Sequence, residues 1–149
     1  MKCGSAGEYD DPQFEDGELL YRRVPKKPDY VEIIDPVNGQ RRPALAAFSI
    51  SKQSDGLSVW IHTLIRRHGL STRDLCEDWS THGVARFEAR CLRPQTGVIG
   101  KPTDGAKLGR AHGIIRGPDG VPPRRVWNLI RDEILRTLVY FESDPGDPA

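Results

Sequence analysis

The sequence has few cysteines, no long apolar run and almost no net charge. Each of these features excludes some classes of protein. Its three cysteines, Cys3, Cys76 and Cys91, are odd in number and widely spaced, and none belongs to a Cys-x-x-Cys motif. This spacing argues against a disulfide framework and against a structural zinc site. We therefore expect neither metal nor cofactor, and we expect a reducing, cytoplasmic environment.

The chain also lacks an N-terminal apolar segment of the secretory type and any run long enough to cross a membrane. Its formal net charge is +1, so no overall field favours nucleic acid or an anionic membrane as partner. The basic residues are mostly arginine, which favours bidentate contacts with carboxylate or phosphate groups. Codon bias in a GC-rich genome is the alternative explanation of that excess.

Length and composition predict one loop-rich domain. A chain of 149 residues suits a single domain with its own core. Only 37% of its residues are hydrophobic, and it contains 15 glycines and 12 prolines, so much of it is expected to be loop. Residues 1–17 are glycine-rich and acidic and are predicted to form a flexible arm. The domain is expected to span residues 18–142, and residues 143–149 are expected to form a flexible tail.

The periodicity of apolar residues predicts an α+β fold. Strands are expected over residues 18–24, 31–34, 44–51, 84–91 and 109–117. Residues 57–65 have apolar side chains at helical spacing and predict a helix that ends at Gly69. A second short helix begins at Ser71, which forms a capping-box pattern with Asp74. The result is a small mixed or mainly antiparallel sheet packed by two short helices and one long C-terminal helix.

The C-terminal helix has the widest apolar stripe. Pro122 and Pro123 set its start, and Asp132 and Arg136 are expected to pair on its outer side. Its predicted core residues are Val126, Trp127, Ile130, Ile134, Leu138 and Phe141.

The segment from Gly109 to Gly117 is the best candidate for a polar site. As a strand it would place His112, Ile114 and Arg116 on one face and small residues on the other. Small side chains allow a ligand or another backbone to approach closely. A structural histidine at a strand edge, a ligand-binding histidine and an acid-base catalyst are the three interpretations of His112.

Four short motifs carry a resemblance. They are Leu20-Tyr21-Arg22-Arg23-Val24, Ala-Ala-Phe-Ser at Ala46 to Ser49, Leu57-Ser58-Val59, and Ala-His-Gly-Ile-Ile-x-Gly at Ala111 to Gly117. Together they resemble a group of small bacterial proteins to which no activity is attached. The resemblance covers about Leu19 to Gly117 and implies a bacterial, intracellular origin.

An arginine on a first strand, a serine-bearing strand and a later polar residue also resemble, loosely, the layout of ADP-ribosyltransferase-type folds. That resemblance implies an arginine that holds a pyrophosphate. The chain departs from the pattern because Glu88 and Glu133 are expected on outward faces, which leaves no late catalytic acid. No Gly-x-Ser-x-Gly motif marks a nucleophile either. The candidate ligand-binding residues are Arg22, Arg23, Ser49, Ser51, Ser58 and His112.

Three functions remain open at this point. The first, which we favour, is a non-enzymatic binding or interaction domain with a protein partner. The second is an enzyme or binder for a nucleotide or a phosphorylated small molecule, with Arg22, Ser49, Ser58 and His112 in the pocket. The third is contact with nucleic acid through the arginine pairs, which is disfavoured because solvated surface charge explains most of those pairs.

Overall fold

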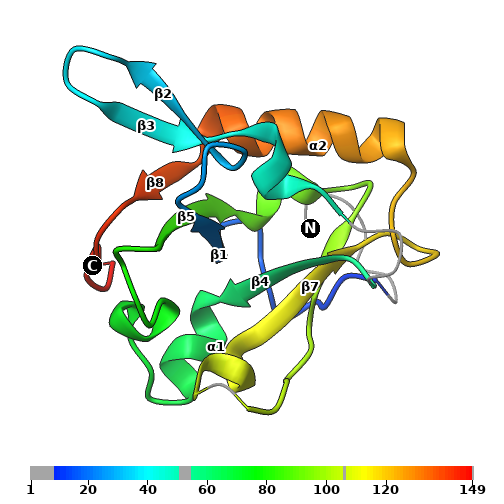
Figure 1. Cartoon of the computed structure of the whole chain (residues 1–149). Helices are drawn as coiled ribbons and strands as arrows, with labels where there is room; N and C mark the ends of the chain where they lie inside the picture. The colour runs from blue at the N-terminus through cyan, green and yellow to red at the C-terminus, as the bar shows by residue number, and fades with distance from the viewer. Residues whose placement is uncertain (1–8, 51–54, 106, 149) are drawn as a thin grey trace.

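The computed structural model describes residues 9–50, 55–105 and 107–148 (Figure 1). Within these residues the strands are β1 (Leu19–Pro25), β2 (Val31–Asp35), β3 (Gln40–Pro43), β4 (Leu57–Ile61), β5 (His82–Glu88), β6 (Gly97–Gly100), β7 (His112–Arg116) and β8 (Val139–Phe141). The α-helices are α1 (His62–Arg67) and α2 (Arg124–Thr137). Short 3-10 helices are η1 (Leu45–Phe48), η2 (Thr72–Leu75), η3 (Ala89–Leu92) and η4 (Lys107–Ala111).

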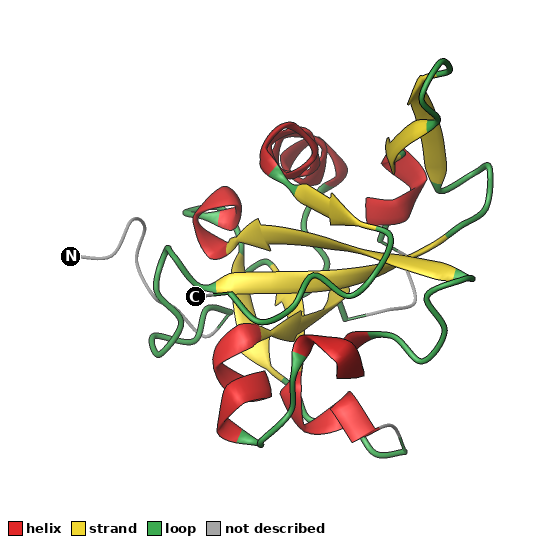
Figure 2. Ribbon diagram, turned by 90° about the vertical axis from the view of Figure 1, so that its left-hand side faces the viewer, coloured by secondary structure: helices red, strands yellow, loops and turns green. Residues whose placement is uncertain are grey.

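The main sheet has six strands in the order β6-β7-β4-β1-β5-β8, and β2 and β3 form a separate hairpin. Each neighbouring pair of strands is antiparallel. The first strand of the chain therefore lies in the interior of the sheet. Helix α2 lies at the top of the view in Figure 1 and α1 at the bottom, with strands of the sheet between them, and Figure 2 shows the same arrangement from another side. This architecture confirms the α+β prediction.

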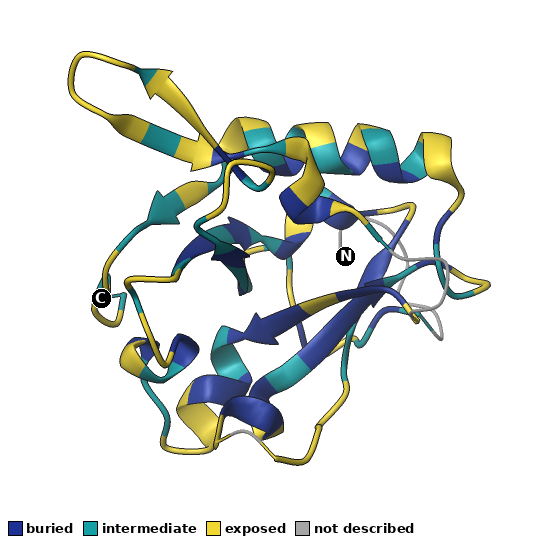
Figure 3. Cartoon of the chain, in the orientation of Figure 1, coloured by how far each residue is buried: buried dark blue, intermediate teal, exposed yellow. Residues whose placement is uncertain are grey.

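Strand alternation gives the sheet two distinct faces. Leu20 pairs with Phe87, and both point toward α2, on what we call the α2 face. The ring of Phe87 packs edge-on against Phe48 of η1, with centroids 5.9 Å apart, and Trp127 Nε1 of α2 donates a 2.7 Å hydrogen bond to the Phe48 carbonyl oxygen. Trp127 and Ile134, on the inner side of α2, are buried. The outer side of the helix is exposed (Figure 3).

The opposite face is the tryptophan face. Tyr21 pairs with Trp60, and Trp60 pairs with His112, so the three side chains form one row across β1, β4 and β7. Within β7, His112, Ile114 and Arg116 occupy this face and Gly113 the other, as the alternation of the segment predicts.

Two predicted elements have a different type in the structure. Residues 44–51 are predicted to be a strand, but Leu45–Phe48 form η1. The buried side chains there are the adjacent residues Ala47 and Phe48, which a strand would send to opposite faces. Residues 57–65 are predicted to be helical, but Leu57–Ile61 form β4, which runs directly into α1. The spacing of apolar residues across this junction fits a helix by coincidence.

Several strands and helices also begin or end at residues other than those predicted. Strand β5 ends at Glu88 because the next residues form η3, and β7 begins at His112 because the preceding residues form η4. Helix α2 ends at Thr137, so Phe141 lies in β8 rather than on the helical stripe. Arg136 pairs with Glu133 at 2.6 Å, one turn back, instead of Asp132.

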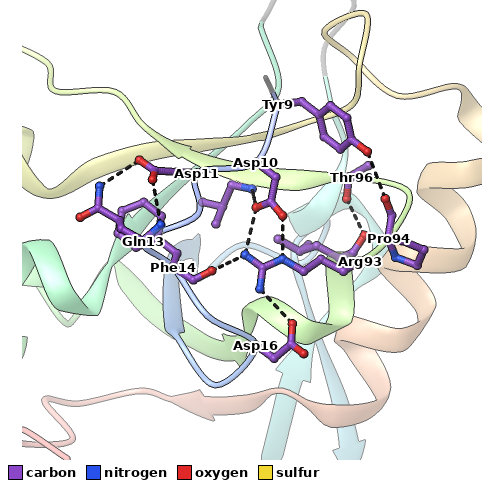
Figure 4. A network of polar contacts seen from close by, with 11 residues as sticks. Tyr9, Asp10, Asp11, Gln13, Phe14, Asp16, Arg93, Pro94 and Thr96 are labelled. Atoms are coloured by element: carbon purple, nitrogen blue, oxygen red, sulfur yellow. Dashed lines mark hydrogen bonds and ion pairs between the residues drawn. The ribbon is translucent and has the colours of Figure 1, made fainter. Parts of the chain in front are cut away.

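Residues 9–17 pack against the body of the domain, which the prediction of an arm over residues 1–17 did not anticipate. Asp10 and Asp16 face Arg93, whose side chain is only 1% exposed (Figure 4). Arg93 Nε and Nη2 donate to the two carboxylate oxygens of Asp10 at 2.9 and 3.0 Å, and Nη1 donates to Asp16 at 2.9 Å. Burial lowers the pKa of Arg93, but the bonds to Asp10 and Asp16 outweigh it, and the net pKa is raised. The acidic composition of the segment favours solvent exposure and therefore did not predict this buried ion pair.

Candidate ligand-binding site

Strands β1 and β4 separate beyond a short paired region, and Arg22 occupies the gap. The two strands pair only at Leu20 with Ile61 and Tyr21 with Trp60, whereas β4 remains paired with β7 along its length. Arg22 Nη1 donates a 2.8 Å hydrogen bond to the Ser58 carbonyl oxygen, and Nε donates a 2.6 Å bond to that of Ala47. The guanidinium thus links β1, β4 and η1 where a ladder of backbone bonds is missing.

Among the described residues, no neighbouring acid balances the charge of Arg22. Burial lowers the pKa of Arg22 to about 10, so the side chain is still a cation at neutral pH. Within the described part of the chain, no carboxylate forms an ion pair with Arg22 or Arg23, and Nη2 of Arg22 has no hydrogen-bond partner. Buried cations in proteins are usually paired, because desolvation of an isolated charge is costly. This position therefore retains a positive charge that an anion would compensate.

Arg23 contributes a second cation, from the other face of β1. Its guanidinium carbon lies 4.4 Å from the ring centroid of Trp60, in a cation–π contact. The edge of Trp60 meets the His112 ring at a centroid distance of 6.0 Å and an angle of 76°. His112 Nδ1 lies 2.9 Å from the carbonyl oxygen of Lys101, which places its hydrogen on Nδ1 and leaves Nε2 as the acceptor of the neutral ring.

A surface hollow of about 400 Å³ lies at this strand separation, and we call it the arginine hollow. Its volume is within the range of small-molecule sites, about 300 to 1,000 Å³. Its described lining combines two cations with three aromatic rings and includes no carboxylate. The residues are Arg22, Arg23, Pro25, Tyr30, Ala47, Trp60 and His82.

The structure brings some of the predicted site residues together and separates others. Arg22 and Arg23 line the same hollow, while His112 is one strand farther away and reaches it only through Trp60. Ser58 contributes its backbone carbonyl to Arg22, and its side chain is exposed. Ser49 is exposed at the end of η1 and does not line the hollow. Ser51 lies outside the described residues.

The expected ADP-ribosyltransferase-like layout is not present in this arrangement. Its serine-bearing strand corresponds to residues 44–51, where the structure has η1. Arg22 holds two backbone carbonyls, which leaves only part of its guanidinium for a ligand.

Sequence reasoning missed the three aromatic side chains of the hollow, Tyr30, Trp60 and His82, and also Pro25 and Ala47. Trp60 was assigned to the apolar stripe of a helix, although Leu57, Val59 and Ile61 alternate with Ser58 and Trp60 as a strand requires. Tyr30 and His82 lie in or beside turns, where no periodicity exists to mark them. Their approach to Arg22 depends on tertiary packing alone.

The remaining candidates for chemistry are weaker. The Cys91 sulfur lies 3.3 Å from Thr137 Oγ1 in a separate hollow of about 550 Å³ between β5 and α2. Among the described side chains, no group of three or more His, Cys, Asp and Glu residues is arranged to hold a metal ion. No helix in the described residues has the length and apolar character needed to cross a membrane.

No protein-family model, curated protein or solved structure matches the chain. The arguments for function therefore rest on the geometry above.

Proposed function

We propose that this domain is a non-enzymatic binding module for a phosphorylated small molecule, with nucleotides as the first class to test. The observation that supports the proposal is the pair of unbalanced cations, Arg22 and Arg23, beside one hollow with aromatic walls. An anionic group would supply the charge that the described residues do not.

The two arginines offer complementary donors to such a group. Stacking on Trp60 uses the flat face of the Arg23 guanidinium and leaves its in-plane N–H groups free for a bidentate contact. Arg22 is fixed by two carbonyl bonds and presents Nη2. A phosphate that binds both cations would leave an attached ring near Tyr30 and His82, which favours a nucleotide over a free phosphate.

A binding role is favoured over catalysis by the lining of the hollow. Its described lining includes no carboxylate and no Ser, Thr or Cys side chain. The hydroxyl nearest His82, that of Thr81 at 2.9 Å from Nδ1, is outside the lining, so the hollow itself contains no nucleophile paired with a base. Nucleophilic catalysis needs such a nucleophile–base pair.

Calorimetric titration with AMP, adenosine and inorganic phosphate tests the proposal. We expect AMP to bind more tightly than either fragment. Arg23→Met should weaken AMP binding about 10- to 100-fold, because a hydrogen bond to a charged group contributes about 1.5 to 3 kcal/mol. Arg90→Met is the matched control, because Arg90 is exposed and paired with Glu88 at 2.8 Å. Equal AMP affinity in Arg23→Met and wild-type protein would refute the proposal.

A second candidate function is protein binding through the β2–β3 hairpin. The hairpin projects from the body of the domain, and in it Ile33 is 63% exposed and Val37 is 96% exposed (Figure 1). Strands β2 and β3 pair only with each other in the described residues, so their outer edges are open to a further strand. Pro43 and Val31 are buried at the base and anchor the hairpin.

Chemical cross-linking in the native cells tests this candidate. A cross-linked partner of the wild-type chain should disappear with Ile33→Ser/Val37→Ser. It should persist with Leu129→Ser, which alters an exposed leucine on α2. Loss of the partner in all variants, or in none, would remove the hairpin from consideration.

A further inference from the structure

Two buried polar atoms on the tryptophan face lack partners. Tyr21 is completely buried, and its hydroxyl has no hydrogen-bond partner among the described residues. The Nδ1 atom of His62 is also buried and without a described partner. The two rings are neighbours, with centroids 6.2 Å apart. An unsatisfied buried polar group costs about 1 to 3 kcal/mol and native proteins contain few, so two adjacent ones call for a ligand.

A cation lies beside this pair. Arg86 is directly opposite Tyr21 in the β1–β5 ladder, on the same face, and its guanidinium carbon lies 5.0 Å from the ring centroid of Phe141. No ion pair joins Arg86 to a carboxylate of the described residues. Burial raises the pKa of Tyr21, and the positive charge of Arg86 and the close approach of its guanidinium to the hydroxyl oppose that rise. We call Tyr21, His62 and Arg86 the tyrosine cluster.

The acid nearest along the chain is already engaged. Glu18 accepts hydrogen bonds from the Thr63 backbone N–H at 3.2 Å and from the Thr63 hydroxyl, at the start of α1. The tyrosine cluster offers three donors, because the Tyr21 hydroxyl and the Arg86 guanidinium donate, and so does His62 in the tautomer that carries its hydrogen on Nδ1.

The C-terminal segment is attached to η2 by two hydrogen bonds. Thr72 is buried at the start of η2, where its hydroxyl donates to Asp144 at 2.8 Å and its backbone N–H donates to Asp147 at 3.1 Å. Burial has the largest effect on both groups and raises the pKa of Tyr21 but lowers that of His62, and the negative charges of Glu18 and Asp147 act to raise both. A carboxylate of the chain itself thus acts on the tyrosine cluster.

We propose that the tyrosine cluster is a binding position for a small oxyanion, phosphate or carboxylate, and that the segment from Ser143 to Pro148 covers it. Asp147 is the competing carboxylate in the covered state. Release of the two bonds to Thr72 makes the donors available to an external anion. The position is separate from the arginine hollow and does not depend on it.

Phosphate binding to a released variant tests this proposal in an Arg23→Met background, which weakens anion binding at the arginine hollow. Asp144→Ala/Asp147→Ala removes both attachments, and a chain that ends at Glu142 removes the segment. Asp104→Ala/Asp119→Ala is the control, because it removes the same charge from two exposed sites elsewhere. Inorganic phosphate and acetate are titrated separately, with NMR of the His62 ring and calorimetry as readouts.

We expect the released variants to bind at least one of the two anions about tenfold more tightly than the control, as removal of a tethered competitor predicts. The His62 signals should shift during that titration, and Arg86→Met should abolish the gain. A gain for acetate alone identifies a carboxylate ligand, and a gain for phosphate identifies a phosphoryl ligand. The proposal is overturned if folded released variants bind neither anion more tightly, or if the gain survives Arg86→Met.

Discussion

Arg22 donates a 2.8 Å hydrogen bond to the carbonyl oxygen of Ser58 across a gap in the sheet. The two residues belong to neighbouring strands that are no longer paired at this point. The Arg22 side chain therefore replaces backbone hydrogen bonds between the two strands. Its positive charge lies in the wall of the arginine hollow. Structural support and a candidate binding site depend on the same guanidinium.

Arg22→Met should destabilise the domain by about 1 to 3 kcal/mol, because it leaves the Ala47 and Ser58 carbonyls without their donor. Urea unfolding measures the loss. Arg23→Met should cost less than about 1 kcal/mol, since it removes only a cation–π contact. Similar losses for both variants would contradict the assignment of a structural role to Arg22 alone.

Arg93→Met should be far more costly, by about 3 to 5 kcal/mol, because it removes the guanidinium from a buried ion pair with Asp10. Arg90→Met, within the adjacent short helix η3, should change the free energy of unfolding by less than about 0.5 kcal/mol, as expected for an exposed ion pair. Denaturant midpoints of the two variants give the comparison. A small loss for Arg93→Met would mean that residues 9–17 contribute little to the stability of the core.

Gly113→Ala should destabilise the sheet by about 1 to 3 kcal/mol. An added Cβ would lie 2.8 Å from the Ile99 carbonyl oxygen and would also overlap the end of the Ile61 side chain. Gly17→Ala is the control, because a Cβ there meets nothing within 4 Å. Thermal unfolding should separate the two, and a stable Gly113→Ala variant would show that β6 and β7 are spaced more widely than described.

Stability should fall as the pH drops through the range just below 6.5. Burial lowers the pKa of His62, partly opposed by Glu18, so the folded state binds fewer protons there than the unfolded state. The contribution is fully present above the ordinary pKa of histidine and is lost as the pH falls through the lowered value in the folded protein. Unfolding of wild-type and His62→Gln proteins from pH 7.5 to 5 measures it. An identical pH dependence in the two proteins would refute the effect.

The sequence predicts the strands that alternate plainly, such as β1 and β5, and the long amphipathic helix α2, because a single period determines each. It fails at β4, where a strand continues into a helix and apolar residues satisfy both periods. It also fails at residues 9–17, because charge density alone cannot show that Asp10 meets Arg93 from 83 positions away.

The candidate site is also predicted in part from the sequence. Arg22 and Arg23 can be proposed from their place on an early strand, and the alternation of β7 correctly assigns the face of His112. The position of β4 between β1 and β7 cannot be derived, and it determines that Trp60, rather than His112, contacts Arg23. A local pattern contains no information about strand order.

The interior place of β1 has a consequence for synthesis on the ribosome. Strand β1 pairs with the end of β4 and with all of β5. It is the first strand to be synthesised, and its pairing cannot be complete until residue 88 has left the ribosome. At about 5 to 20 residues per second this wait lasts on the order of several seconds. During that time Leu20, Tyr21 and Val24, which are fully buried in the finished domain, are exposed on an unpaired strand. We expect this nascent segment to be the part of the chain that chaperones bind first.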